Sequence, residues 1–188
     1  IECPYHGWAY DLAGSLKSAP NMIGVESFDQ QDYSLHAVPC VVWQGFVLIN
    51  LDRDCRPFES CHASILSRFD DWGLEDLVSA HRVTYDIQAN WKIVFQNYNE
   101  CYHCSVVHPQ LSPVTSVATA SNDFTEGAFL GGPMILSDNC DTVSTDGALC
   151  GDLFPRLSNE DRKRVYFYTL FPNLFISPHP DYVLTHRI

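Results

Sequence analysis

The chain has 188 residues, 46% of them hydrophobic, which is enough to bury a core in one or two domains. Its formal net charge of -12 argues against nucleic acid or an anionic membrane surface as a partner. No apolar run approaches the roughly 20 residues that a membrane-spanning helix needs. The 8 cysteines lie beside histidines rather than in a disulfide framework, so we expect a reducing, cytoplasmic location.

The N-terminus carries a C-x-x-H pair, Cys3 and His6, in a loop that Pro4 and Gly7 make tight. A thiolate and an imidazole at this spacing can bind zinc or one corner of an iron–sulfur cluster. A lone cysteine and histidine in a metal-free turn is the competing interpretation. The chain opens without methionine and closes inside a strand-like stretch, so we expect it to be cut from a longer protein at both ends.

The first half of the chain predicts a small β domain followed by a second domain. Residues 40–51 indicate two strands around a glycine-centred turn. The polar, proline-containing stretch that follows suggests a boundary, with residues 1–56 in one domain and residues 57–188 in the other. Beyond the boundary, residues 60–72 have the apolar spacing of a helix, and residues 81–87 alternate like a half-buried strand.

The segment from Asn90 to Pro109 is the most informative part of the sequence. Asn90 is a suitable N-cap. Apolar residues then recur at helical spacing, at Trp91, Val94, Phe95 and Tyr98. We therefore predict a helix over most of the segment, with Glu100 and His103 on one face because they are three residues apart.

His103 and His108 are five residues apart, about 140° around an ideal helix, which is too far for both to reach one ion. Pro109 disfavours helical geometry at His108, so we expect His108 to swing back toward His103. Two imidazoles and a later carboxylate would form the facial triad of a non-haem Fe(II) oxygenase, with positions open for O2. Two alternatives stay open, namely polar surface histidines and a zinc or dithiol site on the C-x-x-C pair Cys101 and Cys104.

The C-terminal half predicts an antiparallel sheet. Strand-like segments occupy residues 127–136, with an interruption at 131–133, and residues 165–171, 173–177 and 182–187. Ser158 to Asp161 resembles a capping box before a short helix. A sheet that holds a long helix is an α+β arrangement.

Together, these motifs resemble the large (alpha) subunits of Rieske non-haem iron oxygenases. The stretch Cys-Pro-Tyr-His-Gly-Trp is similar to the second cluster loop of that family, and His103 and His108 match its two iron histidines, spaced H-x4-H. The resemblance implies the C-terminal part of a small all-β Rieske [2Fe-2S] domain followed by a helix-grip catalytic domain. It implies that Cys3 and His6 hold the cluster, that the first cluster loop lies upstream, and that the third iron ligand, an aspartate, lies beyond Ile188.

Glu100 stands where most of that family carries aspartate, and its implied role is to bridge the two metal sites across a subunit boundary in a homotrimer. Glutamate at this position resembles the branch that acts on quaternary ammonium compounds such as glycine betaine and carnitine. Aromatic rings can hold a trimethylammonium group. Aromatic residues of this region are Tyr166, Phe167, Tyr168, Phe171 and Phe175.

The resemblance implies the terminal oxygenase component of a two-component monooxygenase. Its cofactors would be a Rieske [2Fe-2S] cluster and mononuclear Fe(II), with O2 as co-substrate and electrons from NAD(P)H through a ferredoxin or flavin reductase. Hydroxylation of an N-methyl group would give a carbinolamine that collapses to formaldehyde and a demethylated amine. The first alternative is an aromatic-ring hydroxylating dioxygenase alpha subunit, and the second is a zinc-binding structural module.

Overall fold

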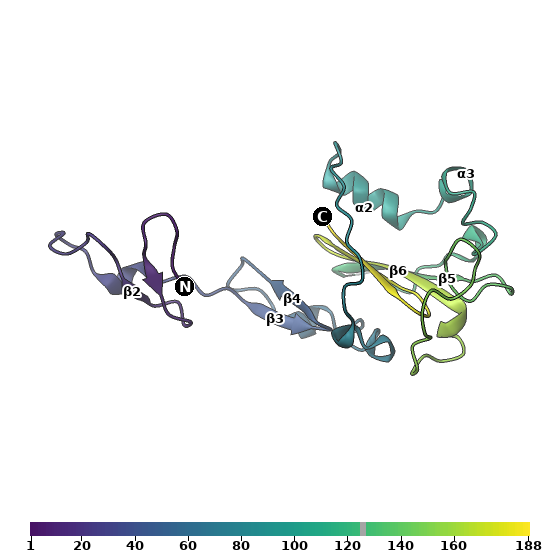
Figure 1. Cartoon of the computed structure of the whole chain (residues 1–188), viewed down its shortest axis with the longest axis horizontal. Helices are drawn as coiled ribbons and strands as arrows, with labels where there is room; N and C mark the ends of the chain where they lie inside the picture. The colour runs from purple at the N-terminus through teal and green to yellow at the C-terminus, as the bar shows by residue number, and fades with distance from the viewer. Residues whose placement is uncertain (125–126) are drawn as a thin grey trace. The chain divides into compact units, whose positions relative to one another are not determined.

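A computed structural model describes residues 1–124 and 127–188 of the chain. They form two compact units, and Figure 1 shows short strands in the first and a sheet with helices in the second. None of the described helices has the length and apolar character that a membrane span needs. The predicted α+β class is confirmed.

The first unit comprises Ile1–Val42 and Val47–Cys55. Its first elements are β1 (Ala9–Tyr10), β2 (Leu16–Ser18) and a 3-10 turn, η1 (Gln30–Tyr33). β1 and β2 pair antiparallel. The Asp11 carboxylate closes the turn between them, because it accepts the backbone N–H groups of Ala13 and Ser15, each at 2.9 Å.

A hairpin of strands β3 (Cys40–Trp43) and β4 (Phe46–Ile49) confirms the two strands predicted around a glycine-centred turn. Gln44 and Gly45 have φ angles of 52° and 81°. Two consecutive residues with positive φ are typical of a two-residue hairpin turn, whose twist matches that of the flanking strands.

The second unit, Trp43–Phe46 and Arg56–Ile188, is built on a four-stranded antiparallel sheet in the order β5-β6-β7-β8. Its strands are β5 (Phe129–Ile135), β6 (Arg164–Leu170), β7 (Leu174–Pro178) and β8 (Val183–Arg187). The strand-like segments at residues 165–171, 173–177 and 182–187 predicted the last three strands, and this prediction is confirmed.

Strand β5 runs without a break through Gly131 and Gly132, so the interruption predicted there is wrong. Both glycines pair in register with β6. A Cβ atom on Gly132 would lie 2.2 Å from the carbonyl oxygen of Ser121. Glycine is therefore used here for the close approach of another backbone segment rather than for a turn.

Residues 58–76 fold as a series of short turns, and the continuous helix predicted over residues 60–72 is wrong. The short helical elements in and beyond this segment are α1 (Phe58–Cys61), η2 (Asp70–Trp72), η3 (Leu74–Asp76), η4 (Val117–Thr119) and η5 (Asp161–Lys163). Three of the four apolar residues of the predicted helix face, Ile65, Phe69 and Trp72, are still at most 3% exposed, while Leu66 is half-buried. Successive tight turns can bury residues at the same spacing as a helix does.

Arg68 and Phe69 attach this segment to one face of the sheet. The Phe69 and Tyr168 rings lie 5.5 Å apart, and Arg68 Nε donates to the Tyr168 hydroxyl at 3.0 Å. The Arg68 guanidinium also lies 4.3 Å from the centre of the Tyr166 ring. Tyr166 and Tyr168 therefore belong to this face of β6.

Helix α2 (Trp91–Asn99) covers the other face of the sheet (Figure 1). The predicted N-cap is confirmed, because the Asn90 side chain accepts a backbone N–H of the first turn at 3.0 Å. The Phe95 ring lies 4.6 Å from that of Phe175, and the Tyr98 ring stacks on Phe175 at 4.0 Å. This aromatic layer fixes α2 on the sheet, as a helix-grip arrangement requires.

The strand predicted over residues 81–87 is wrong. No helix or strand includes this segment, and it has no strand partner among residues 1–124 and 127–188. Its apolar side chains are exposed, by 55% at Val83 and 74% at Tyr85. Alternation matches the two faces of a strand, but a strand also needs a neighbour that pairs with its backbone groups.

Candidate metal centre

The predicted long helix over residues 90–109 breaks after Asn99, and a short helix, α3 (Cys104–Val107), follows the break. The Asn99 side chain fixes this end, donating to the Phe95 carbonyl at 2.8 Å and accepting from the Thr169 hydroxyl at 2.9 Å. Glu100 is extended, with φ −121° and ψ 146°. The predicted helical position of Glu100 is therefore wrong, because the end of α2 is tied to β6.

Glu100 and His103 nevertheless meet. The Glu100 carboxylate contacts His103 Nδ1 and accepts the backbone N–H of Tyr102 at 2.6 Å. The pKa of the Glu100 carboxyl is lowered, chiefly by its hydrogen bond with the His103 ring. With Nδ1 of a neutral His103 donating to the carboxylate, Nε2 has its lone pair free for a metal.

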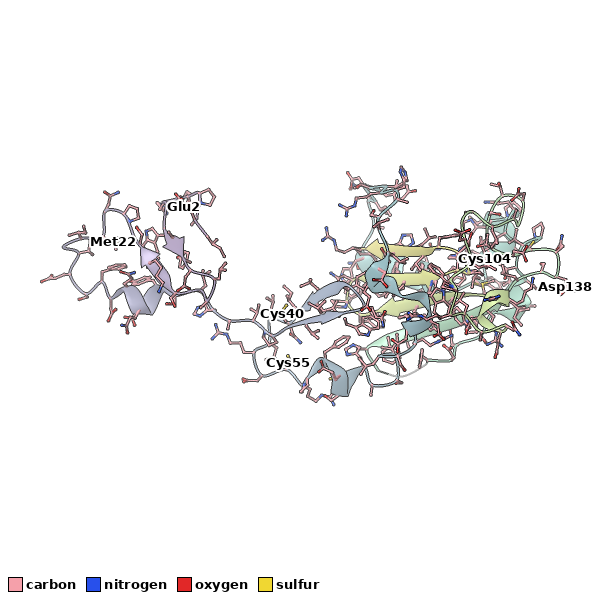
Figure 2. The ribbon with its side chains drawn as sticks, turned by 60° about the horizontal axis from the view of Figure 1, so that its bottom comes forward. Glu2, Met22, Cys40, Cys55, Cys104 and Asp138 are labelled. Atoms are coloured by element: carbon pink, nitrogen blue, oxygen red, sulfur yellow. The ribbon has the colours of Figure 1, made fainter. Side chains whose placement is uncertain are left out.

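His108 caps the end of α3 with φ −119° and ψ 60°, which is not helical geometry. This conformation agrees with the restriction that Pro109 places on the residue before it. The His103 and His108 rings lie 5.3 Å apart between centres at an angle of 71°. The structure therefore brings the two imidazoles together at the two ends of α3; Figure 2 labels Cys104, which directly follows His103.

The donors at α3 fit part of an iron facial triad. Two adjacent imidazoles supply two of its three protein ligands, and a carboxylate orients one of them. Among residues 1–124 and 127–188, no group of three or more His, Cys, Asp or Glu side chains is arranged to hold a metal ion. A closed four-ligand zinc site is therefore not formed by the described residues.

Both histidines line a cavity of about 860 Å³ in the second unit. Glu100 and the rings of Tyr98 and Phe167 contribute to the same lining. One wall is a loop segment, residues 143–145, which belongs to no helix or strand. No described lining residue is lysine or arginine, so Glu100 is the clearest charge in the cavity.

Of the five aromatic residues predicted to crowd this region, only Phe167 lines the cavity. Tyr166 and Tyr168 point to the opposite face of the sheet, because neighbours on a strand alternate. Phe175 lies beneath Tyr98. Sequence analysis missed Tyr98 as a cavity residue. Its spacing places it on the apolar face of α2, and nothing in the sequence indicates that it also faces a cavity.

Cys3 and His6 lie in a tight loop of the first unit, near Glu2, which Figure 2 labels. The Cys3 backbone closes this loop, because its N–H donates to the Trp8 carbonyl at 2.8 Å and its carbonyl accepts from Gly7 N at 2.9 Å. His6 is exposed and Cys3 is half-buried, with its thiol free. One thiol and one imidazole fit half of the four ligands of a Rieske cluster.

Comparison with known proteins identifies the family. The sequence profile described as "Ring hydroxylating alpha subunit (catalytic domain)" matches residues 74–188, which is more than half of the chain. The chain belongs to this family. A second profile, that of the Rieske [2Fe-2S] domain, matches residues 1–29 of this alpha subunit and includes Cys3 and His6.

Relatives of this alpha subunit act on quaternary ammonium compounds. The carnitine monooxygenase oxygenase subunit of Acinetobacter pittii is 39% identical over 111 residues, which are 58% of this chain and 30% of that protein. The glycine betaine monooxygenase oxygenase subunit of Pseudomonas aeruginosa is 33% identical over 111 residues, 59% of this chain and 26% of that protein. The predicted resemblance to the glycine betaine and carnitine branch is confirmed.

A solved quaternary ammonium Rieske monooxygenase, associated with carnitine oxidation by gut microbiota and with inter-subunit electron transfer, is similar to this alpha subunit in structure. The match has a TM-score of 0.75 and 26% identity and covers 98% of this chain and 47% of that chain. The chain thus spans about half the length of that solved relative and less of the curated ones.

Proposed function

We propose that this chain is part of the terminal oxygenase of a two-component Rieske monooxygenase that hydroxylates an N-methyl group of a quaternary ammonium compound, such as glycine betaine or carnitine. The observation that carries the proposal is the His103–His108 pair, with Glu100 on His103, in a cavity lined by Tyr98 and Phe167. The relatives named above support the substrate class.

In this proposal, residues 57–188 belong to the catalytic domain, and His103 and His108 bind mononuclear iron together with a carboxylate from outside residues 1–188. The iron supplies, when bound, the activation of O2. Glu100 keeps a proton at Nδ1 of His103 and so directs Nε2 to the metal. Residues 1–56 are the C-terminal part of the Rieske domain, in which Cys3 and His6 supply one thiolate and one imidazole to the [2Fe-2S] cluster.

The cavity suits a cation. The Tyr98 and Phe167 rings lie 6.1 Å apart between centres at an angle of 68°, and aromatic faces attract quaternary ammonium groups. The Glu100 carboxylate adds a negative charge, and its lowered pKa keeps it ionised. A substrate with a fixed positive charge is therefore favoured over an aromatic acid, which has no cationic group for Glu100 and the aromatic rings to attract.

The reaction balances with electrons from NAD(P)H. One oxygen atom of O2 enters a C–H bond of the N-methyl group, and the other leaves as water after taking two electrons and two protons. The resulting N–CH2OH group loses its hydroxyl proton. Its C–N bond breaks with the electron pair left on nitrogen, which releases formaldehyde and the demethylated amine. The electrons arrive one at a time through a ferredoxin or flavin reductase.

We also propose that Glu100 bridges the iron site of one subunit to the cluster of the next, which requires a homotrimer or another closed ring. Its carboxylate is 40% exposed beside His103, so it is accessible to a second partner. The cytoplasm is the proposed location, since the described cysteines are free thiols.

The test is oxygen uptake by the full-length protein with its reductase, across quaternary ammonium compounds and aromatic acids. The proposal expects substrate-dependent O2 and NAD(P)H consumption with formaldehyde from an N-methyl compound. Dihydroxylated product from an aromatic acid would instead establish the ring-hydroxylating dioxygenase that the family description favours. Zinc in a colourless protein would establish the structural module.

A further inference from the structure

The wall loop, residues 142–151, borders the cavity without belonging to a helix or strand. Its residues 143–145 line the cavity, so their position determines the space that a substrate can occupy. A wall of this kind needs side chains to hold it, because it has no strand ladder. The loop makes bonds within itself, such as that from the Ser144 hydroxyl to the Ala148 carbonyl at 2.8 Å, and bonds from the turn between β7 and β8 tie it to the sheet.

Two adjacent residues of that turn bind both ends of the wall loop. The Tyr182 hydroxyl donates to the Val143 carbonyl at 2.6 Å. One oxygen of the Asp181 carboxylate accepts the Thr142 hydroxyl at 2.6 Å. Its other oxygen accepts the backbone N–H groups of Cys150 at 2.5 Å and Gly151 at 3.1 Å.

The turn itself is firmly held. His179 donates its backbone N–H to the Tyr182 carbonyl at 2.9 Å, and its ring stacks on the Tyr182 ring at 4.2 Å. The indole N–H of Trp72 donates to the His179 carbonyl, also at 2.9 Å. Thr142, the residue that Asp181 holds, is fully buried. The turn is therefore a rigid base for the loop.

We infer that Asp181 and Tyr182 are positioning residues that hold the cavity wall at Val143–Thr145 and so decide which substrates fit. They do not line the cavity, and their effect passes through the loop backbone. The inference rests on the proposed function for the class of substrate. It adds a determinant of substrate length that lies outside the metal ligands and the aromatic lining.

The test uses full-length Tyr182→Phe and Asp181→Asn, with Tyr166→Phe as the matched control. Tyr182→Phe keeps the ring on His179 and removes only the hydroxyl that holds Val143. Tyr166→Phe removes a similar bond, from the Tyr166 hydroxyl to Asp161 at 2.5 Å, on the opposite face of the sheet. Amide hydrogen exchange of residues 142–151 measures how often the loop opens, and it needs no substrate.

Values of kcat/KM are then measured for quaternary ammonium compounds of graded length and for aromatic acids. They show whether the space in the cavity has changed. We expect loop exchange to rise about fivefold in both test variants, the effect of losing one typical hydrogen bond. The ratio of kcat/KM between long and short substrates should change by a similar factor, mainly through KM. Tyr166→Phe should change neither quantity.

Unchanged loop exchange, or faster exchange with a wild-type substrate ratio, overturns the inference. A change of the same size in Tyr166→Phe does so too, because it would show a general loss of stability. The proposed function fails by a different observation, namely that the wild-type protein turns over none of the quaternary ammonium compounds. In that case the ratio of kcat/KM between long and short aromatic acids tests the inference by itself.

Discussion

His179 should make the second unit less stable in mild acid, and one substitution should remove this effect. Its side chain is 2% exposed, and neither ring nitrogen has a hydrogen-bond partner among residues 1–124 and 127–188. Burial lowers the pKa of His179 from 6.5 to about 4, with Asp181 opposing part of the shift. A proton therefore binds the unfolded chain more tightly than the folded one.

The sign and size of the effect follow from this difference. The stability due to neutral His179 is fully present above pH 6.5 and is lost as the pH falls toward 4. Between pH 8 and pH 5, stability is lost only over the 1.5 pH units that lie below the unfolded pKa of 6.5. At 1.36 kcal/mol per unit, the expected loss is about 2 kcal/mol.

Urea unfolding at pH 8 and pH 5, followed by tryptophan fluorescence, measures this loss. His179→Phe keeps an aromatic ring against Tyr182 but binds no proton, so its pH dependence should be smaller than that of the wild type by about 2 kcal/mol. His81→Gln, at an exposed position, is the control and should keep the wild-type pH dependence. A His179→Phe variant that loses as much stability in acid as the wild type would refute the reasoning.

Three further predictions concern the metal centre and the sheet. In the full-length protein, His103→Ala or His108→Ala should remove mononuclear iron and activity while the visible spectrum of the cluster remains; normal iron content would contradict the ligand assignment. Glu100→Gln should keep both metals and the proposed trimer and strongly slow electron transfer to the iron in a single turnover, because glutamine keeps a carbonyl acceptor but loses the charge that strengthens both hydrogen bonds. Normal transfer would return Glu100 to an ordinary surface carboxylate. Gly132→Ala should destabilise the second unit by more than about 3 kcal/mol in urea, because its Cβ would lie 2.2 Å from Ser121 O; a smaller loss would show that the Ser121 segment can move.

Features set by near neighbours were predictable from the sequence. The Asn90 cap, the hairpin turn at Gln44 and Gly45, and the turn at Ser158, whose hydroxyl accepts the Asp161 N–H at 3.0 Å, each depend on a few consecutive residues. The approach of His108 to His103 followed from one proline. The family motifs are equally local, because each lies within a short run of residues, and the amino-acid sequence alone therefore carries the resemblance.

Features that depend on distant partners were decided only by the tertiary structure. Glu100 leaves the helix because the Asn99 side chain bonds to Thr169, seventy residues later in the chain. Residues 81–87 alternate as a strand does but lack a partner among the described residues, so their pattern alone does not form one.

The shape of the cavity shows the same division most clearly. Its two histidines, His103 and His108, are five residues apart, and the sequence predicted that they approach each other. Its wall depends on bonds between Val143 and Tyr182 and between Thr142 and Asp181, each spanning 39 residues. A hydrogen bond over that separation leaves no periodic pattern in the chain, so residue type and spacing determine the chemistry of this site, while packing determines the space around it.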